Sequence, residues 1–454
     1  MTDSPLPKVD PFKQHLQRRQ RVGRVWGRVF YLCNFVAILT LIALFFNIIN
    51  NAFGYVATSY QRAPSTLSDT PLETLDKAGL AAILQKEAPK KLRVLIRDTL
   101  SRVSKEEFSK LPLSAVLNGS VLTPDVANLK VSEISDDQAV KILIDNMDQV
   151  GLYNAVMSQI VEPTILQSWP LFESLTQRDT IAAQIKENYP DAEMVFRSWV
   201  NSTFLQNTVS SYAISAGLRT ALIGTLLVIT ITSLFAFPLG IGSALYLEEY
   251  ASDNWLNRLI ETNIRNLAGV PSIIYGMLGL TVFVRLLAPI TSGAIFGVTD
   301  TDGRTILSAG LTLGLVILPV IIISAQEAIR AVPPSIREAS YGLGATKLQT
   351  IVRTVLPTAM PGILTGIILS LSRAIGETAP LIVVGASTFI TIDPNGPFSK
   401  FTVVPIQIFQ WTSKPQQEFR NTAAAAIVVL MVVLVILNSF AIMLRNRYTR
   451  RLGS

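Results

Sequence analysis

The chain has 454 residues, of which 49% are hydrophobic and only 16% charged, and its formal net charge is +7. This balance indicates a membrane protein and excludes an ordinary soluble multidomain protein. The basic residues concentrate beside apolar runs, which is typical of the positive-inside rule rather than of nucleic-acid binding. One cysteine and one histidine argue against a disulfide framework, a zinc site with several Cys or His ligands and a Cys–His catalytic pair, so we expect neither a metal nor a cofactor.

Six segments are long and apolar enough to cross about 30 Å of hydrocarbon as helices. They comprise residues 29–53, 218–246, 267–290, 305–329, 361–386 and 422–444. The first is longer than a signal-peptide core and lacks a clear cleavage site, so we interpret it as a retained anchor. Arginines precede the first span and follow the last, which predicts that the tails 1–28 and 446–454 are cytoplasmic.

Residues 54–217 form a polar insert of domain size between the first two spans. With both tails inside, this insert is predicted to be extracytoplasmic, and its charged, periodic stretches indicate mostly helices. The expected fold class is therefore an all-α membrane protein with six transmembrane helices, of which residues 29–53 are the first and residues 218–445 hold the other five. Proline and glycine recur inside the spans, as at Pro238 and Pro271, and fit either the kinked helices of a transporter or close helix packing.

The segment "EASYGLGATKLQTIVRTVLP", residues 338–357, lies in a predicted cytoplasmic loop and contains two glycines followed by Lys347. It does not fit a Walker A phosphate loop, because Ala345 and Thr346 separate Gly344 from the lysine and no strand precedes the glycines. The loop therefore needs another interpretation.

Helix signals in this loop comprise two capping-box pairs and three helix-ending residues: Ser335 with Glu338, Thr346 with Gln349, and Gly342, Gly344 and Pro357. They predict two short helices, the first ended by glycines in left-handed conformations and the second by the proline. The pattern alone leaves two roles open for this helix-turn-helix elbow. It either rests on the membrane surface or docks on a partner.

Arg373 and Glu377 lie four residues apart in the fifth span and are expected on one helix face. An ionised group at the bilayer centre costs roughly 2.5–3.5 kcal/mol on insertion scales, so such groups usually turn inward and pair. From the residues alone, a structural ion pair and a functional pair are equally good interpretations.

Part of the cytoplasmic loop matches a known pattern through Glu338, Ala339, Ser340, Gly344, Leu356 and Pro357. The pattern resembles the EAA loop of ABC importer permeases, the coupling element that fits a groove of the ATPase subunit. Ser340 stands where alanine is usual and Thr354 where a large aliphatic residue is common. Neither departure removes the expected helices or the turn.

The resemblance extends over residues 215–445. The segments "GTLLVITITSLFAFPLGIGSALYLEEYA" (224–251), "NLAGVPSIIYGMLGL" (266–280) and "LPTAMPGILTGIILSLSRAIGETAPLIVVGA" (356–386) look like the PstA-type permease of the phosphate ABC transporter. This resemblance implies half of a phosphate pathway in a bacterial inner membrane, with ATP hydrolysis in a separate subunit and no catalytic residues here. The implied partners are a second related permease, two ATP-binding subunits and a periplasmic phosphate-binding protein.

The resemblance also implies roles for individual residues. Arg373 would be the anion contact, because a guanidinium matches phosphate oxygens in a bidentate fashion, and Glu377 would hold it in place. Thr378 and Ser372 would add hydroxyl donors. The residues expected to couple to the ATPase are Glu338, Ala339, Gly344, Leu356 and Pro357, within residues 335–357.

Two alternatives remain open. One is a permease for another oxyanion, such as sulfate or molybdate. The other is a membrane-anchored sensor, which the short cytoplasmic segments disfavour because a sensor needs an intracellular output module. For the insert we expect a part in docking the binding protein, since it lies on the side where substrate arrives.

Overall fold

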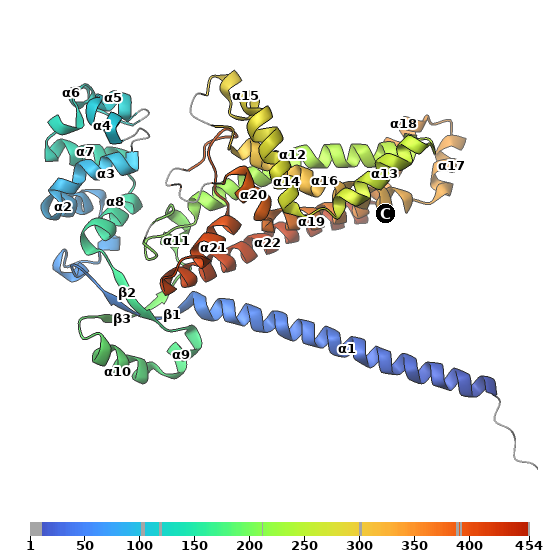
Figure 1. The fold of residues 1–454 in the computed structure, drawn as a ribbon, viewed down its shortest axis with the longest axis horizontal. Coiled ribbons are helices and arrows are strands. Elements are labelled where there is room, and N and C mark those ends of the chain that lie inside the picture. Colours follow the sequence, from blue (N-terminus) through green and yellow to red (C-terminus); the bar gives the residue numbers. More distant parts are fainter. Residues whose placement is uncertain are drawn as a thin grey trace, which may run out of the picture.

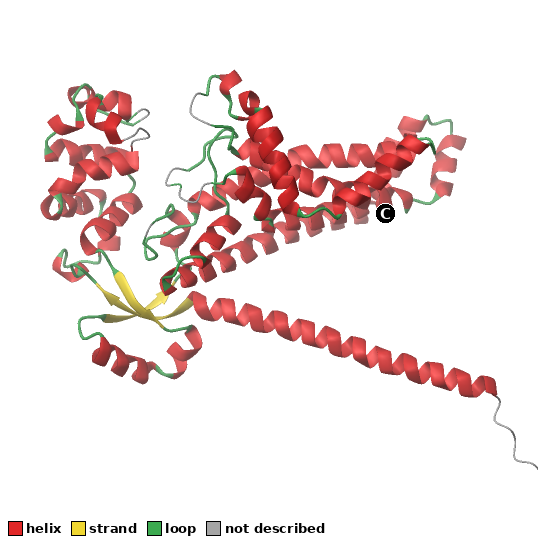
Figure 2. Cartoon of the chain, in the orientation of Figure 1, coloured by secondary structure: helices red, strands yellow, loops and turns green. Residues whose placement is uncertain are grey.

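The structure is a computed structural model that describes residues 11–100, 105–117, 120–210, 212–298, 302–386, 390 and 393–452. Figure 1 shows an elongated helix bundle, a helical lobe at one end of it, and a long helix, α1 (Pro11–Ala52), that diverges from the bundle. Helices dominate, and the strands are confined to the junction between these parts (Figure 2). The first ten residues of the predicted tail 1–28 and the last two of the tail 446–454 lie outside the described residues.

Within the described residues, five helices are long and apolar enough to cross a membrane. They are α1, α12 (Arg219–Leu245), α16 (Ile306–Arg330), α19 (Leu356–Gly376) and α22 (Gln417–Leu452). A sixth crossing results if α13 (Trp255–Ala268) and α14 (Ser272–Gly279) are taken together as one bent span. The chain is an integral membrane protein, and the expected all-α class is confirmed. The central helix is α16, which packs against α12, α14 and α19.

The predicted third span, 267–290, is not one continuous helix. The chain bends by 107° between α13 and the segment Ser272–Leu286. Pro271 lies at this bend, where it has no amide proton to continue the α13 ladder. Residues 255–266, which lie between the predicted second and third spans, instead belong to the helix α13.

The predicted fifth span, 361–386, is displaced. One apolar helix runs from Lys347 to Gly376 through α18 (Lys347–Thr350), a π-helical turn at Ile351–Val355 and α19. The chain then breaks before α20 (Ala379–Val384). Pro357 does not end a helix as predicted, because it occupies the first turn of α19, just after the π turn, where a residue without an amide proton is tolerated.

Short helices make up most of the insert, as predicted. They are α2 (Lys77–Glu87), α3 (Leu92–Leu100), α4 (Lys105–Lys110), α5 (Leu113–Val116), α6 (Pro124–Ala127), α7 (Asp136–Asn146), α8 (Gln149–Val156), α9 (Leu171–Thr176), α10 (Arg178–Asn188) and α11 (Ser202–Gln206). Fully buried leucines and isoleucines such as Leu84, Ile96 and Leu143 form the core of its larger lobe. Two further short helices, α15 (Ala288–Thr291) and α21 (Val404–Thr412), lie at the same end of the bundle as the insert.

A three-stranded sheet, not predicted from the sequence, joins the insert to the bundle. Its antiparallel order is β2 (Thr164–Ser168), β1 (Phe53–Ser59), β3 (Glu193–Ser198), and β1 continues directly from α1. Asn421 of α22 donates a hydrogen bond to Ser168 of β2 at 2.9 Å, and the Phe204 and Trp411 rings pack with their centroids 6.0 Å apart. The insert therefore rests on the ends of α21 and α22.

Candidate functional site

The charged pair predicted in the fifth span is present at the end of α19. Arg373 Nε lies 3.1 Å from Glu377 Oε1, with 45% of the arginine side chain and 18% of the glutamate side chain exposed. The expectation that both residues share one helix face is wrong, because α19 ends at Gly376 and Glu377 has extended backbone. The pair instead spans the break between α19 and α20, where the cationic arginine also lies at the negative end of the α19 dipole.

This break lies level with the middle of the neighbouring helices, with Ala374 packed inward and Arg373 exposed. Ala374, next to the arginine, is buried in one apolar cluster with Ala236 of α12, Tyr275 of α14 and Ile317 of α16. Both Ala236 and Ile317 are far from the ends of their helices. Side-chain charges at such a depth need a compensating partner or a polar cavity.

α14 and α20 approach closely beside the break. A Cβ added at Gly276 of α14 would lie 2.7 Å from the Cα of Pro380 in α20. Only glycine permits this backbone approach, so the packing of α14 holds the segment after Glu377 in place.

The two hydroxyl residues proposed beside the pair have local partners. Ser372 Oγ lies 2.7 Å from Asn438 Oδ1 of α22 and 2.9 Å from the Ile368 carbonyl oxygen. Thr378 Oγ1 lies 3.4 Å from the Gly376 carbonyl oxygen. Ser372 thus links α19 to α22, whereas Thr378 stays at the helix break.

The segment 335–357 contains the predicted helix-turn-helix elbow, with one capping box instead of two. Thr346 and Gln349 form the predicted reciprocal box at the start of α18. The box predicted for Ser335 and Glu338 is wrong, because α17 (Pro334–Gly342) begins two residues earlier than that cap requires. Pro334 lies in its first turn, and Pro333 is at the cap without a side-chain bond.

Gly344 makes the turn of this elbow. Its φ of +83° lies in the left-handed region, as predicted, whereas Gly342 remains within α17 and does not share that conformation. Glu338, Ala339 and Gly344 are all exposed, and Leu356 and Pro357 are half-buried at the start of α19.

Leu343 was not among the predicted site residues. It lies at the tip of the elbow, between α17 and Gly344, and is 90% exposed. Tyr341 and Leu348 beside it are also exposed, so the elbow presents an apolar tip. The signal that could have identified Leu343 in the sequence is a hydrophobic residue directly before a turn-forming glycine.

One ion pair joins the elbow to the end of α12, and a second joins α16 to the same place. Arg337 of α17 lies 3.0 Å from Glu249, and Arg330 of α16 lies 2.5 Å from Glu248. Both carboxylates belong to the π-helical turn Tyr246–Tyr250 that ends α12. Arg258 takes no part in these pairs, because it lies 3.1 Å from Asp253.

Among the described residues, no group of three or more His, Cys, Asp or Glu side chains is arranged to hold a metal ion. The structure therefore offers two candidate functional features. One is the Arg373–Glu377 pair at the break between α19 and α20, and the other is the elbow, with its apolar tip and its ion pair to α12. Neither contains the paired nucleophile and base expected of a hydrolytic centre.

Comparison with known proteins decides the family. A family model described as "Binding-protein-dependent transport system inner membrane component" matches residues 236–450. The chain is 35% identical over 238 residues to the phosphate transport system permease protein PstA 1 of Mycobacterium tuberculosis, covering 52% of this chain and 73% of that protein. The chain belongs to this family of ABC importer permeases.

Other relatives of the permease share the same region. It is 32% identical over 182 residues to the probable ABC transporter permease protein YqgH of Bacillus subtilis, a match that covers 40% of this chain and 56% of that protein. The solved inward-facing MetNI methionine ABC transporter is similar with a TM-score of 0.40 and 19% identity, covering 51% of this chain and 95% of that one. The family match includes both the Arg373–Glu377 pair and the elbow, while residues 54–217 lie outside it.

Proposed function

We propose that this permease is the membrane-spanning subunit of an ATP-driven phosphate importer and forms half of its translocation pathway. The observation that carries the proposal is the Arg373–Glu377 pair at a helix break level with the middle of the bundle, in a chain that resembles a phosphate transport permease. ATP hydrolysis belongs to a separate subunit. The permease itself supplies the pathway and the element that couples it to the ATPase.

The proposed location is the bacterial inner membrane, with both tails, 1–28 and 446–454, in the cytoplasm. The arginines before the first span and after the last support this orientation. It places the insert, 54–217, in the periplasm and the elbow within 335–357 in the cytoplasm. The permease core is then 218–445.

Arg373 is the proposed phosphate contact. Its guanidinium has five N–H donors in a planar fork, of which the Nε group is directed to Glu377, so donors remain for phosphate oxygens. Glu377 holds the fork, moderates its attraction so that the anion leaves again, and accepts the remaining proton of hydrogen phosphate. Thr378 supplies a hydroxyl at the same break, and Ser372 fixes α19 against α22 through Asn438.

The elbow is the proposed coupling site for the ATPase. Glu338, Ala339 and Gly344 are exposed on it, and Leu356 and Pro357 connect it to α19, the helix that ends at Arg373. Movement of the elbow therefore has a direct route to the charged pair. Coupling requires that phosphate and the binding protein bind the inward-facing and outward-facing states with different affinity.

The complete importer needs a second, related permease, two ATP-binding subunits and a periplasmic phosphate-binding protein. The apolar surface of α1 supports the need for further neighbours, since side chains such as Phe30 and Leu41 are exposed along it and must lie against lipid or protein. The insert lies at the end of the bundle opposite the elbow (Figure 1) and is proposed to help dock the binding protein. Normal uptake and normal binding-protein affinity after deletion of residues 60–205 would contradict that role.

Uptake of radiolabelled phosphate tests the proposal. The intact chain, expressed with its partner subunits in cells that lack other phosphate importers, is expected to import phosphate without competition from sulfate. Arg373→Ala should abolish uptake at matched membrane levels. Arg265→Ala, which removes another ion pair of i,i+4 spacing, is the control and should leave uptake unchanged.

Each other outcome changes the conclusion. Full uptake by Arg373→Ala would make the Arg373–Glu377 pair structural. Uptake of sulfate or molybdate in place of phosphate would assign another oxyanion, and a chain that imports none of these and does not copurify with an ATPase would fit a membrane-anchored sensor.

A further inference from the structure

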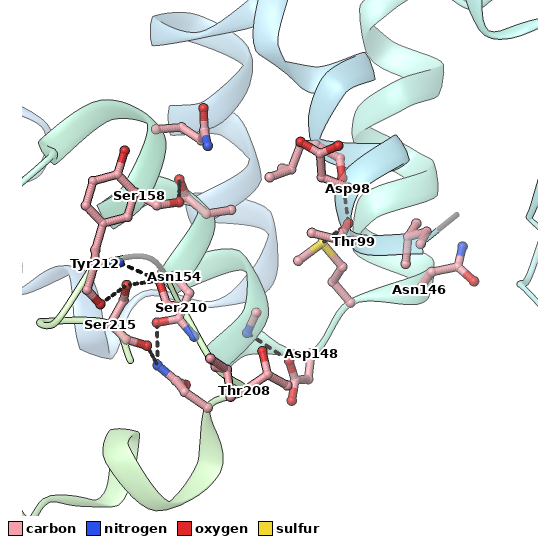
Figure 3. Close-up of a pocket in the computed structure, with 18 of the residues that line it drawn as sticks. Asp98, Thr99, Asn146, Asp148, Asn154, Ser158, Thr208, Ser210, Tyr212 and Ser215 are labelled. Atoms are coloured by element: carbon pink, nitrogen blue, oxygen red, sulfur yellow. Dashed lines mark hydrogen bonds between the residues drawn. The ribbon is translucent and has the colours of Figure 1, made fainter. Parts of the chain in front are cut away.

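A small cavity lies in the insert, beside the sheet. Its volume is about 80 Å³, and its polar walls are formed by Arg197 of β3, Tyr153 and Asn154 of α8, Glu73 and Thr203. Asn154 and Ser215 also line a larger neighbouring cleft of about 870 Å³, shown in Figure 3. All of these residues lie outside the matched family region, and the proposed pathway uses none of them.

Arg197 brings a charge into this cavity and forms no ion pair among the described residues, although the Glu73 carboxylate lines the same cavity. Its Nη2 group donates a hydrogen bond to the Ile214 carbonyl oxygen at 2.7 Å, and the guanidinium carbon lies 5.0 Å from the centroid of the Trp199 ring. The Nε group is buried and has no hydrogen-bond partner.

Burying the Arg197 guanidinium in this way costs free energy unless a ligand accepts its remaining hydrogen bonds. A buried donor without a partner loses its hydration and gains nothing in return, and the cost is larger for a charged group. The Ile214 carbonyl and the Trp199 ring contact the guanidinium and do not neutralise it. The uncommitted N–H groups of Arg197 therefore call for an anionic acceptor in the cavity.

The other walls specify the kind of anion. Thr203 has no described hydrogen-bond partner for its hydroxyl, and Asn154 accepts from Asn207 at 2.9 Å, which leaves its own amide group as a donor. Glu73 faces the same cavity and lies 3.4 Å from the Tyr153 hydroxyl group. A carboxylate repels a fully ionised anion but accepts a hydrogen bond from one that carries a proton.

The cavity has the size of a small ion. A water-sized position needs about 10–15 Å³ of such volume, so about 80 Å³ accommodates the five heavy atoms of a tetrahedral oxyanion. A group attached to the ion would have to extend into the neighbouring cleft.

We propose that the cavity formed by Arg197, Glu73, Tyr153, Asn154 and Thr203 binds a free tetrahedral oxyanion that carries a proton. Arg197 binds the charged oxygens, Thr203 and Asn154 donate to them, and Glu73 accepts the proton of the ion. The choice of hydrogen phosphate as that ion rests on the proposed function, whereas the oxyanion class rests on the cavity alone. The insert would then hold a phosphate site outside the membrane, separate from Arg373.

Binding of radiolabelled inorganic phosphate to the purified full-length chain tests this site. The chain carries Arg373→Ala throughout, so that the proposed pathway site does not contribute. We expect saturable binding that Arg197→Gln weakens about tenfold or more, because a charge-assisted bidentate contact is lost. Arg178→Gln, at an exposed position on α10, is the control and should leave binding unchanged.

Three further measurements test the site, and the first two separate binding from folding. Phosphate should alter the fluorescence of Trp199, beside the guanidinium, and Trp199→Phe should remove that change without removing binding. Arg197→Lys keeps the charge and loses the planar fork, so it should fold with an unchanged unfolding temperature and still bind phosphate more weakly. Glu73→Gln should reduce the preference for phosphate over sulfate.

Absence of phosphate binding to the Arg373→Ala chain, or binding that Arg197→Gln and Arg197→Lys leave unchanged, would overturn the inference. If that result accompanies normal phosphate uptake by the intact transporter, the proposed function stands and only the insert site fails. If phosphate binds at Arg197 in a chain that does not support uptake, the insert site stands and the proposed function fails.

Discussion

The Arg337 guanidinium of α17 lies 3.0 Å from the Glu249 carboxylate, which belongs to the π-helical end of α12. Their side chains are 20% and 8% exposed, respectively. Arg337 also donates to the carbonyl oxygens of Ile329 and Val332 at the end of α16. One side chain therefore connects the elbow to two membrane helices.

Removal of this connection is expected to uncouple the proposed importer. Glu249→Gln replaces a charged acceptor of Arg337 by a neutral one and leaves a partly buried arginine without its counter-ion, at a cost of about 2 kcal/mol in the free energy of unfolding. The ATPase should still bind and hydrolyse ATP, while phosphate imported per ATP falls severalfold in reconstituted vesicles. Asp253→Asn, which removes the more exposed pair with Arg258, is the control. An unchanged ratio of transport to hydrolysis would show that the pair is only structural.

Leu343 at the tip of the elbow should contribute to binding of the ATPase. Leu343→Gln removes an exposed apolar anchor without disturbing a core, so we expect copurification with the ATPase to fall while the permease keeps its unfolding temperature. Val121→Gln changes an exposed apolar residue in the insert and should have no effect. Equal copurification of both variants would remove Leu343 from the docking surface.

The close approach of α14 and α20 predicts a contrast between two glycines. Gly276→Ala would place a Cβ 2.7 Å from the Cα of Pro380, and we expect a loss of about 1–3 kcal/mol in stability from overpacking. A Cβ at Gly242 of α12 would meet nothing within 4 Å, so Gly242→Ala should be neutral or slightly stabilising. Unfolding temperatures in the same detergent test this contrast, and equal values would contradict the close packing.

Tyr153 in the insert predicts a loss of stability in alkali. Burial, together with the nearby Glu73 charge, raises the pKa of Tyr153 from 10.0 to about 12. The folded chain therefore holds the phenol proton more tightly than the unfolded chain, and the free energy of unfolding falls as pH rises from about 10 to about 12. Unfolding temperatures across this range should fall less for Tyr153→Phe than for the unsubstituted chain. Parallel profiles would show that other groups cause the loss.

Local patterns in the sequence predicted much of the fold. Apolar length identified five helices that are long enough to cross a membrane, one of them displaced, and the remaining predicted span overlaps the bent pair around Pro271. The capping box of Thr346 and Gln349 is present at α18. These features depend on neighbours within one or two helical turns, which the sequence contains explicitly. The ion pair of Arg373 and Glu377 was predicted for the same reason.

Predictions failed where distant segments or helix junctions decide the outcome. The sheet joins strands separated by more than a hundred residues in the chain, and its short strands have no strong alternation of their own. Glu249 and Arg337 are 88 positions apart, so their pairing depends on how α12 packs against α16 and α17. The bend at Pro271 was expected as a kink within one span, but the proline lies between two helices that turn by 107°.

The sequence by itself determined that the chain enters a membrane, which segments do so and which residues carry charge there, because hydrophobicity and helix signals are local. Only the tertiary structure decided that Glu377 lies outside its helix, that Arg337 ties the elbow to α12, and that Arg197 and Glu73 face one cavity. These relationships arise from packing between segments distant in the chain, where close glycine contacts and paired charges, rather than local propensity, determine which side chains meet.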